Sequence, residues 1–294
     1  MGNKILSRLK AYLKLARLRH WIKNTIVAIP AFFGGRLLEE NTAPSILLAF
    51  TVFSLCSSSV YVINDICDVE RDRLHPTKRD RPLASGAVSL VEGYILLVLF
   101  TASALMLSIY LCGFSIDLAI PVIYILLNLL YSKLFKNKPI ADIVILVSGF
   151  FLRLLWGASV ADVRISSWLY LTVVALSIFL AFGKRRNEKL TCSDTARPVL
   201  ARYSDRYLNS SMYTYLALFL VFYSLWSTDP STAAGMIYTT PLVAVMMMRY
   251  TYSLESGGHG NPVDMILSDR PLLAMGGLYG VCVFLIIYFP EVLP

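Results

Sequence analysis

Acidic residues recur at helical spacing in the segment from Asn64 to Gly86. Asp65, Asp68 and Asp72 stand at positions i, i+3 and i+7, so on a continuous helix they would lie within roughly 60° of one another on one face. Two carboxylates about 5 Å apart repel by roughly 3 kcal/mol at an effective dielectric near 20. The acidic row therefore requires cations, and Mg²⁺ that carries a diphosphate is the ligand these residues favour.

A basic loop follows the acidic row. His75, Lys78 and Arg81 supply cationic side chains, and Pro76 and Pro82 favour extended backbone at the residues before them. Such a loop would hold the outer oxygens of a diphosphate, or a second phosphate. A solvated loop that only orients the protein would explain the basic residues, but it would not explain acids on one face.

A further polar segment runs from Tyr131 to Asp142 and holds three lysines around a proline. Tyr131, Lys133 and Lys138 are candidates for substrate binding. Two interpretations stay open for this segment. Either the lysines are ordinary topogenic charges while Asp142 satisfies a helix dipole, or the segment lines a phosphate site.

Arg153 stands between two leucines near the middle of an apolar run. A guanidinium at that depth costs roughly 2.5–3.5 kcal/mol, so its side chain should face a cavity or an anionic partner. We interpret Arg153 as a phosphate-binding residue, with a purely structural ion pair as the alternative.

Three cations, Lys184, Arg185 and Arg186, follow one another at the end of the sixth predicted span, and Glu188 is the only acid nearby in the sequence. Cations at a helix C-terminus stabilise the helix dipole, which is one account of this basic run. The other is a second phosphate site, separate from the acidic row.

Hydropathy determines the expected fold. The chain has 294 residues, 56% hydrophobic content and a mean hydropathy of +0.62, which excludes an ordinary soluble domain and indicates a multispanning membrane protein. We predict an all-α bundle of nine transmembrane helices, each long enough for about 30 Å of hydrocarbon. The expected spans are residues 22–38, 45–65, 88–112, 114–131, 139–160, 166–183, 210–228, 232–250 and 272–290.

Basic residues predict the orientation of these spans. Twenty-four Lys and Arg fall on the side of the N-terminus, against Arg36 and Arg164 on the other, which predicts an N-in, C-out protein of the inner (plasma) membrane. Residues 1–20 have the pattern of an interfacial amphipathic helix. We expect one membrane domain over residues 1–294, with a cytoplasm-facing polar cavity and active-site loops at residues 64–87 and 183–209.

Two other classes are disfavoured by composition. The net charge of +8 is mostly topological, so nucleic acid is not an expected partner. Five scattered cysteines form no CxxC pair and indicate neither disulfides nor zinc.

These residues together resemble the UbiA-type superfamily of intramembrane prenyltransferases. The first signature of that superfamily, NDxxDxxxD after the second of nine helices, is matched by Asn64, Asp65, Asp68 and Asp72. The resemblance implies that these four residues bind Mg²⁺ and a diphosphate in an active site that opens toward the cytoplasm.

Ordinary members of that superfamily carry a second aspartate-rich motif after the sixth helix, where this chain has its basic run. Together with the segments 75–82 and 131–142, this departure is similar to the decaprenyl-phosphate phosphoribosyltransferase branch. The resemblance implies phosphoribosyl pyrophosphate as donor and a polyprenyl phosphate lipid as acceptor, in the synthesis of cell-envelope polysaccharide (arabinan) precursors.

The resulting hypothesis assigns Asp65 and Asp68, with Asn64, to Mg²⁺ and pyrophosphate, and Asp72 to a shared metal or the ribose hydroxyls. The basic run, or Lys78 with Arg81, would hold the 5-phosphate. Two alternatives stay open: transfer of a prenyl chain from a prenyl diphosphate to a small acceptor, and a membrane transporter or lipid carrier. A homo-oligomer is compatible with each of them.

Overall fold

The computed structural model describes residues 2–76, 78–191, 199–256 and 262–291. Within these ranges the backbone is helical or in turns and irregular segments, and it forms no β-strand, so the all-α class is confirmed. The chain divides into two compact units. The first comprises Met1–Ile29, Glu40–Lys133 and Leu152–Ala161, and the second comprises Pro30–Glu39, Leu134–Phe151 and Asp162–Pro294. The expected single membrane domain stays a prediction.

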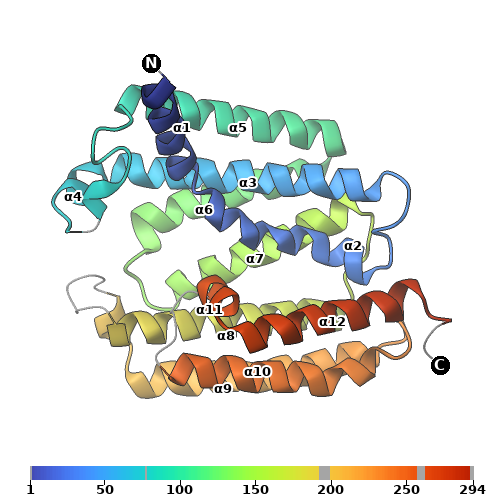
Figure 1. Cartoon of the computed structure of the whole chain (residues 1–294). Helices are drawn as coiled ribbons and strands as arrows, with labels where there is room; N and C mark the ends of the chain where they lie inside the picture. Colours follow the sequence, from blue (N-terminus) through green and yellow to red (C-terminus); the bar gives the residue numbers. More distant parts are fainter. Residues whose placement is uncertain (1, 77, 192–198, 257–261, 292–294) are drawn as a thin grey trace. The chain divides into compact units, whose positions relative to one another are not determined.

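The first unit contains the acidic row. Its elements are α1 (Gly2–Ala16), the 3₁₀ segment η1 (Leu18–Ala28), α3 (Thr42–Cys67), α4 (Val69–Arg73), η2 (Lys78–Asp80), α5 (Leu90–Cys112), η3 (Ile116–Leu118), α6 (Ala119–Leu130) and, from Leu152 onward, α7 (Ala141–Val160) (Figure 1). Apolar side chains of α3, α6 and α7, among them Phe53, Tyr124 and Trp156, form its largest buried cluster. A capping box begins α5, because Ser89 Oγ accepts from the Glu92 amide and the Glu92 carboxylate accepts from the Ser89 amide.

One glycine lets two backbones of the first unit touch. A Cβ atom at position 157 of α7 would lie 1.9 Å from the carbonyl oxygen of Val27 in η1, so no residue larger than glycine fits there without a backbone shift. This contact sets the distance between η1 and the end of α7.

The second unit contains the basic run. Its elements are most of α2 (Ile29–Phe33), the first half of α7, α8 (Ser167–Thr191), η5 (Leu200–Arg202), α9 (Asp205–Ser227), η6 (Met236–Thr239), α10 (Thr240–Glu255), α11 (Pro262–Ser268) and α12 (Arg270–Tyr288). Buried side chains such as Phe179 and Met212 fill the contact between α8 and α9. Ser204 and Asp269 cap the N-termini of α9 and α12 through their side-chain oxygens.

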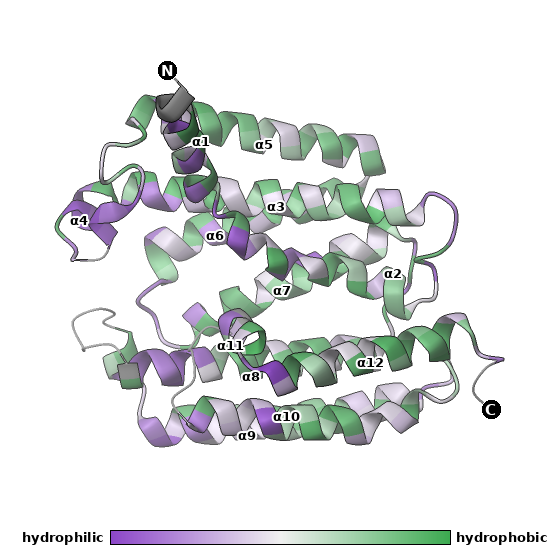
Figure 2. Cartoon of the chain, in the orientation of Figure 1, coloured by the Kyte–Doolittle hydropathy of each residue, from purple (hydrophilic) through white to green (hydrophobic). Residues whose placement is uncertain are grey.

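Seven helices among the described residues are long and apolar enough to cross a membrane, so the chain is a multi-pass membrane protein. They are Thr42–Cys67, Leu90–Cys112, Ile116–Phe135, Ala141–Val160, Ser167–Leu190, Asp205–Ser227 and Arg270–Tyr288. Figure 2 shows α5 as mainly hydrophobic and α4 as hydrophilic. The other two expected spans, 22–38 and 232–250, consist of η1 with the short α2 and of η6 with the 16-residue α10. The nine-span count and the N-in orientation stay predictions.

Three boundaries differ from expectation or refine it. The sixth span was expected to end at residue 183, but α8 continues to Thr191, so the basic run is helical. At the acidic row, α3 ends at Cys67 and α4 begins at Val69. Residues Gly2–Ala16 form α1, with Leu6, Leu9 and Leu13 exposed; its position at a membrane surface stays a prediction.

Candidate functional site

Asp65 and Asp72 converge on one arginine although they belong to different helices. Asp65 lies in the last turn of α3 and Asp72 in α4, and both are buried, with 2% and 3% of their surface exposed. Arg81 Nη1 lies 3.1 Å from Asp65 Oδ1 and 2.6 Å from Asp72 Oδ2. These two carboxylates therefore face the same point, as their spacing in the sequence predicts.

Backbone hydrogen bonds explain why this spacing survives the break between α3 and α4. The Asp68 amide donates to the Asn64 carbonyl (2.9 Å), and the Asp72 amide donates to the Asp68 carbonyl (2.8 Å). The pattern of bonds from i+4 to i thus continues across the junction. The Asp68 side chain is more exposed than the other two and pairs with Arg71 at 3.3 Å.

A second arginine, which no motif or spacing in the sequence indicated, contacts the acidic row. Arg17 lies between α1 and η1, and its Nη2 donates to Asp65 Oδ1 at 2.6 Å. Two buried carboxylates are therefore matched by two guanidinium groups, which offsets much of the cost of burying their charge.

Asn64 connects the acidic row to the segment that begins at Tyr131. Ser132 Oγ donates to Asn64 Oδ1 at 2.5 Å and also lies 2.9 Å from the Asn128 carbonyl. Ser132 belongs to a π-helical turn, Tyr131–Phe135, and turns of this kind are frequent at functional sites. Ser132 was also missed from the sequence; its position beside Tyr131 is the signal that could have found it.

The acidic row and the neighbouring Asn64 offer the kind of ligand atom that a hard divalent cation binds. Asn64, Asp65, Asp68 and Asp72 all present oxygen atoms, which Mg²⁺ prefers. The shared Arg81 nitrogen marks a point where positive charge is held between two carboxylates. Among the described residues, no three His, Cys, Asp or Glu side chains are grouped as a metal site, so the role of these residues as metal ligands stays a proposal.

The basic loop lies beside the acidic row in the first unit. The Lys78 amide donates to His75 Nδ1 at 3.4 Å, and both residues are partly exposed. Lys14 of α1 contacts the same loop through the Asp80 carbonyl, at 2.8 Å. Arg81, the third candidate in this loop, contacts the acidic row directly through Asp65 and Asp72.

Arg153 is buried and donates hydrogen bonds to two neutral side chains of the first unit. Its Nε donates to Asn24 Oδ1 at 2.6 Å, and its Nη2 donates to the Tyr124 hydroxyl at 2.8 Å. The guanidinium also lies over the Tyr124 ring, 4.8 Å from its centroid. These contacts favour a structural role over the phosphate-binding role, which stays a prediction.

The basic run has more acidic neighbours than the sequence suggested. Glu188 was expected to be the only nearby acid, but Arg185 Nε donates to Asp142 at 2.5 Å and Arg186 Nη2 donates to Glu255 at 2.5 Å. Arg185 also binds Glu188 at 2.7 Å. That expectation was wrong because Asp142 and Glu255 are distant in sequence. Each arginine of the run therefore already has a carboxylate partner.

Lys184 is the most accessible member of the run. Its side chain is 33% exposed, compared with 1% for Arg185 and 15% for Arg186. Its distance to Glu188, 3.8 Å, is longer than the 2.5 Å that separates Arg185 from Asp142 and Arg186 from Glu255. Lys133 and Lys138 are exposed, and Lys138 lies over the Phe135 ring.

A buried network ties the start of α7 to α8. Asp142 accepts from Arg185 and, at 2.7 Å, from the Tyr203 hydroxyl. The same hydroxyl accepts from the Ile140 amide at 2.6 Å, which holds Ile140 at a φ of 66°, a value rare for a β-branched residue. Burial raises the pKa of the Tyr203 phenol above its usual value, and the Asp142 carboxylate acts in the same direction. Asp142 therefore has a structural function here.

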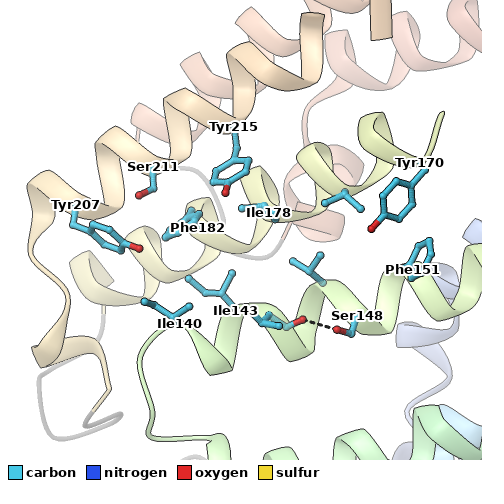
Figure 3. Close-up of a pocket in the computed structure, with 13 residues that line it drawn as sticks. Ile140, Ile143, Ser148, Phe151, Tyr170, Ile178, Phe182, Tyr207, Ser211 and Tyr215 are labelled. Atoms are coloured by element: carbon cyan, nitrogen blue, oxygen red, sulfur yellow. Dashed lines mark hydrogen bonds between the residues drawn. The ribbon is translucent and has the colours of Figure 1, made fainter. Parts of the chain in front are cut away.

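The second unit also has an apolar pocket of about 410 Å³ between α7, α8 and α9. Figure 3 shows Ile143, Phe182 and Tyr215 among the residues that line it. Its polar groups are hydroxyls, including those of Ser148 and Tyr207. Such a lining suits a hydrocarbon chain better than a charged ligand.

Comparison with known proteins places the chain among membrane transferases. The profile of the UbiA prenyltransferase family matches residues 27–262. A decaprenyl-phosphate phosphoribosyltransferase of Corynebacterium glutamicum is 32% identical, over 94% of this chain and 86% of the relative. Its counterpart in Mycolicibacterium smegmatis is 34% identical, over 92% of each chain.

A solved structure shares the fold. The structure of a UbiA homologue from Archaeoglobus fulgidus bound to GPP and Mg²⁺ aligns with a TM-score of 0.70, at 18% identity, over 94% of this chain and 99% of that chain. At this identity the likeness concerns the fold alone.

Proposed function

This chain belongs to the UbiA prenyltransferase family, and from that premise we propose that it transfers 5-phosphoribose from phosphoribosyl pyrophosphate to a polyprenyl monophosphate. The observation that carries the proposal is its likeness, along nearly the whole length of both chains, to two proteins named decaprenyl-phosphate phosphoribosyltransferase. The basic run in place of a second acidic motif supports the same choice of donor. The product would serve the synthesis of cell-envelope polysaccharide.

We assign the acidic row to the pyrophosphate end of the donor. Asp65 and Asp68, with Asn64, would hold Mg²⁺, and Asp72 would share the metal or orient the ribose hydroxyls. Mg²⁺, when bound, would neutralise charge on the pyrophosphate leaving group. The convergence of Asp65 and Asp72 on one cationic nitrogen supports this assignment, because it shows two buried carboxylates aimed at one positive charge.

The reaction exchanges one bond at C1 of the ribose for another. The bond from C1 to the pyrophosphate oxygen breaks, and a phosphate oxygen of the lipid forms a new bond to C1. Carboxylates near C1 would stabilise the positive charge that develops there. A phosphate monoester has a second pKa near 6, so at neutral pH the acceptor is already largely dianionic and needs no strong general base.

The donor's 5-phosphate requires a separate cationic site. We assign Lys184 to it first, because its side chain is the most accessible of the basic run and its ion pair with Glu188, at 3.8 Å, is longer than the 2.5 Å pairs of Arg185 with Asp142 and Arg186 with Glu255. Lys78 and Arg81 are the other candidates.

The proposal is tested with membranes that contain the protein, Mg²⁺, labelled phosphoribosyl pyrophosphate and polyprenyl phosphate. We expect a labelled product that partitions into organic solvent, together with released pyrophosphate. A parallel reaction with labelled prenyl diphosphate and an aromatic acceptor tests the alternative enzyme. A prenylated product there, with no lipid-linked label in the first reaction, would reverse the proposal. Asp65→Asn membranes control for activity of the host.

We also propose that the acidic row faces the cytoplasm from the plasma membrane. Cys67 is exposed beside this row, so a variant that keeps only this cysteine reports the side on which the row lies. A membrane-impermeant maleimide should label Cys67 in inside-out vesicles and leave it unlabelled in intact cells. Labelling in intact cells alone would contradict the orientation.

A further inference from the structure

Arg17 lies in a turn that packs against α3. The contacts of this turn are on the same face of α3 as Asp65. The Ser58 hydroxyl donates to the Ala16 carbonyl at 2.8 Å, the Arg17 guanidinium lies over the Tyr61 ring at 4.5 Å, and Arg17 Nη2 binds Asp65. Residues 58, 61 and 65 follow at i, i+3 and i+7, so they share one face of the helix. The C-terminal end of α1 and the turn after it therefore contact three successive positions on one face of α3, and the last of these is Asp65.

The backbone of Arg17 has a conformation that side-chain-bearing residues seldom adopt. Its φ and ψ are 52° and 49°, the left-handed region that glycine enters most easily. Residues in this region persist where their surroundings fix them, and they cluster at ligand sites and switch regions. At Arg17, the fixing contacts include the two made by its guanidinium, to Tyr61 and to Asp65.

Arg17 and Arg81 hold Asp65 unequally. Both contact the same oxygen, Oδ1, but Arg81 also binds Asp72. Displacing Arg17 breaks one ion pair with the acidic row, whereas displacing Arg81 breaks two. A cation that competes for Asp65 Oδ1 will therefore displace Arg17 more readily than Arg81.

We propose that Arg17 is a substrate-binding residue that changes partner when the donor binds. It pairs with Asp65 in the unliganded protein, gives up that oxygen to the Mg²⁺ of the donor complex, and then pairs with the diphosphate. The exchange preserves charge balance, since the added divalent cation arrives with an anion that the released guanidinium can bind. This inference rests on the proposed function in that it assumes a diphosphate donor bound with Mg²⁺.

The exchange predicts effects of opposite sign on two ligands. When Mg²⁺ binds to Arg17→Gln in the absence of pyrophosphate, it no longer competes with the guanidinium for Asp65. The Kd for Mg²⁺ should therefore fall by about tenfold, which corresponds to the free energy of a hydrogen bond to a charged group. Pyrophosphate bound in the presence of saturating Mg²⁺ loses a cationic partner, so its Kd should rise by about tenfold. Arg17→Lys keeps the charge and should lie between wild type and Arg17→Gln for both ligands.

The experiment measures both Kd values by calorimetry on the full chain in lipid nanodiscs at fixed ionic strength. Arg19→Gln is the matched control, because it removes the same charge two residues away on an exposed side chain; both its Kd values should remain at wild type. Arg17→Gly separates side chain from backbone, since glycine accepts the left-handed turn but has no guanidinium. It should behave as Arg17→Gln does.

The outcomes are distinct. If both ligands bind more weakly to Arg17→Gln, or neither changes, Arg17 is structural and the inference fails. Wild-type affinities in Arg17→Gly would also overturn it, because the turn alone would then account for the residue. If the wild type binds no pyrophosphate with Mg²⁺, the proposed function fails, and this inference fails with it.

Discussion

Arg81 Nη1 contacts carboxylate oxygens of both Asp65 and Asp72, at 3.1 and 2.6 Å. The two acids belong to separate helices, and a loop that lies later in the chain supplies the cation between them. Their charges are thus balanced by residues from at least two segments. The ion pairs of the candidate donor site therefore also hold α3, α4 and the Arg81 loop of the first unit together. Substitutions at these residues will change the stability of the protein as well as its binding of ligands.

Removing Arg81 should destabilise the protein. Arg81→Ala leaves two buried carboxylates with one guanidinium, which should lower the free energy of unfolding by about 2 kcal/mol, less than the value for a fully buried pair because Arg81 is 28% exposed. Thermal unfolding measures this change, and Mg²⁺ should restore part of the lost stability. Arg71→Ala, which breaks the exposed pair with Asp68, is the control and should cost about 0.5 kcal/mol or less. Equal melting temperatures for the two variants would contradict the prediction.

Asp65→Asn should abolish transfer. The substitution keeps the size of the side chain but removes the charge that is proposed to hold Mg²⁺, so turnover should fall by at least about 10²-fold, in line with the loss of a preorganised electrostatic group. The measurement is the initial rate of lipid-linked product as a function of Mg²⁺ concentration. Glu70→Gln removes an exposed acid from α4 and should leave the rate near that of the wild type. Full activity of Asp65→Asn at ordinary Mg²⁺ would remove this residue from the site.

Substitutions of neighbouring residues in the basic run should have different effects, on substrate binding at Lys184 and on stability at Arg185. Lys184→Gln should raise the KM for phosphoribosyl pyrophosphate by about tenfold with an unchanged melting temperature.

Arg185→Ala should instead lower the free energy of unfolding by about 3–5 kcal/mol, because it leaves the buried Asp142 without its cation. Arg202→Gln, an exposed residue of the same unit, controls for net charge. If Lys184→Gln leaves the KM unchanged, the 5-phosphate site belongs elsewhere, and Lys78 becomes the next residue to test.

Gly157→Ala should strongly destabilise the protein, although the substitution adds only one methyl group. The added methyl group would lie 1.9 Å from the Val27 carbonyl oxygen, so η1 and α7 must move apart, at a cost of about 3 kcal/mol or more. Gly277→Ala in α12 is the control, because nothing lies within 4 Å of the added atom. That change should stabilise the protein by about 0.5–1 kcal/mol through helix propensity. Differential scanning calorimetry on both variants measures the contrast, which would be absent if the two backbones were not in contact.

Much of the fold and of the candidate site was accessible from the sequence. Hydropathy indicated an all-α, multi-pass membrane protein, because the length of an apolar run is a local property. The spacing of Asp65 and Asp72 predicted a common face, and the backbone bonds across Asp68 preserve it. The same motif, with its neighbouring segments, was sufficient for family recognition, which the comparisons confirm.

The tertiary structure decided which groups balance those charges. Arg17 reaches Asp65 across 48 positions, Asp142 reaches Arg185 across 43, and Ser132 reaches Asn64 across 68. No periodicity relates such residues, because their contacts depend on how helices pack and not on the local backbone. For that reason the sequence indicated only one acidic partner, Glu188, for the three cations of the basic run. Residue types and local spacing were determined by the sequence alone, whereas the pairing of buried charges follows from the packing that brings distant helices together.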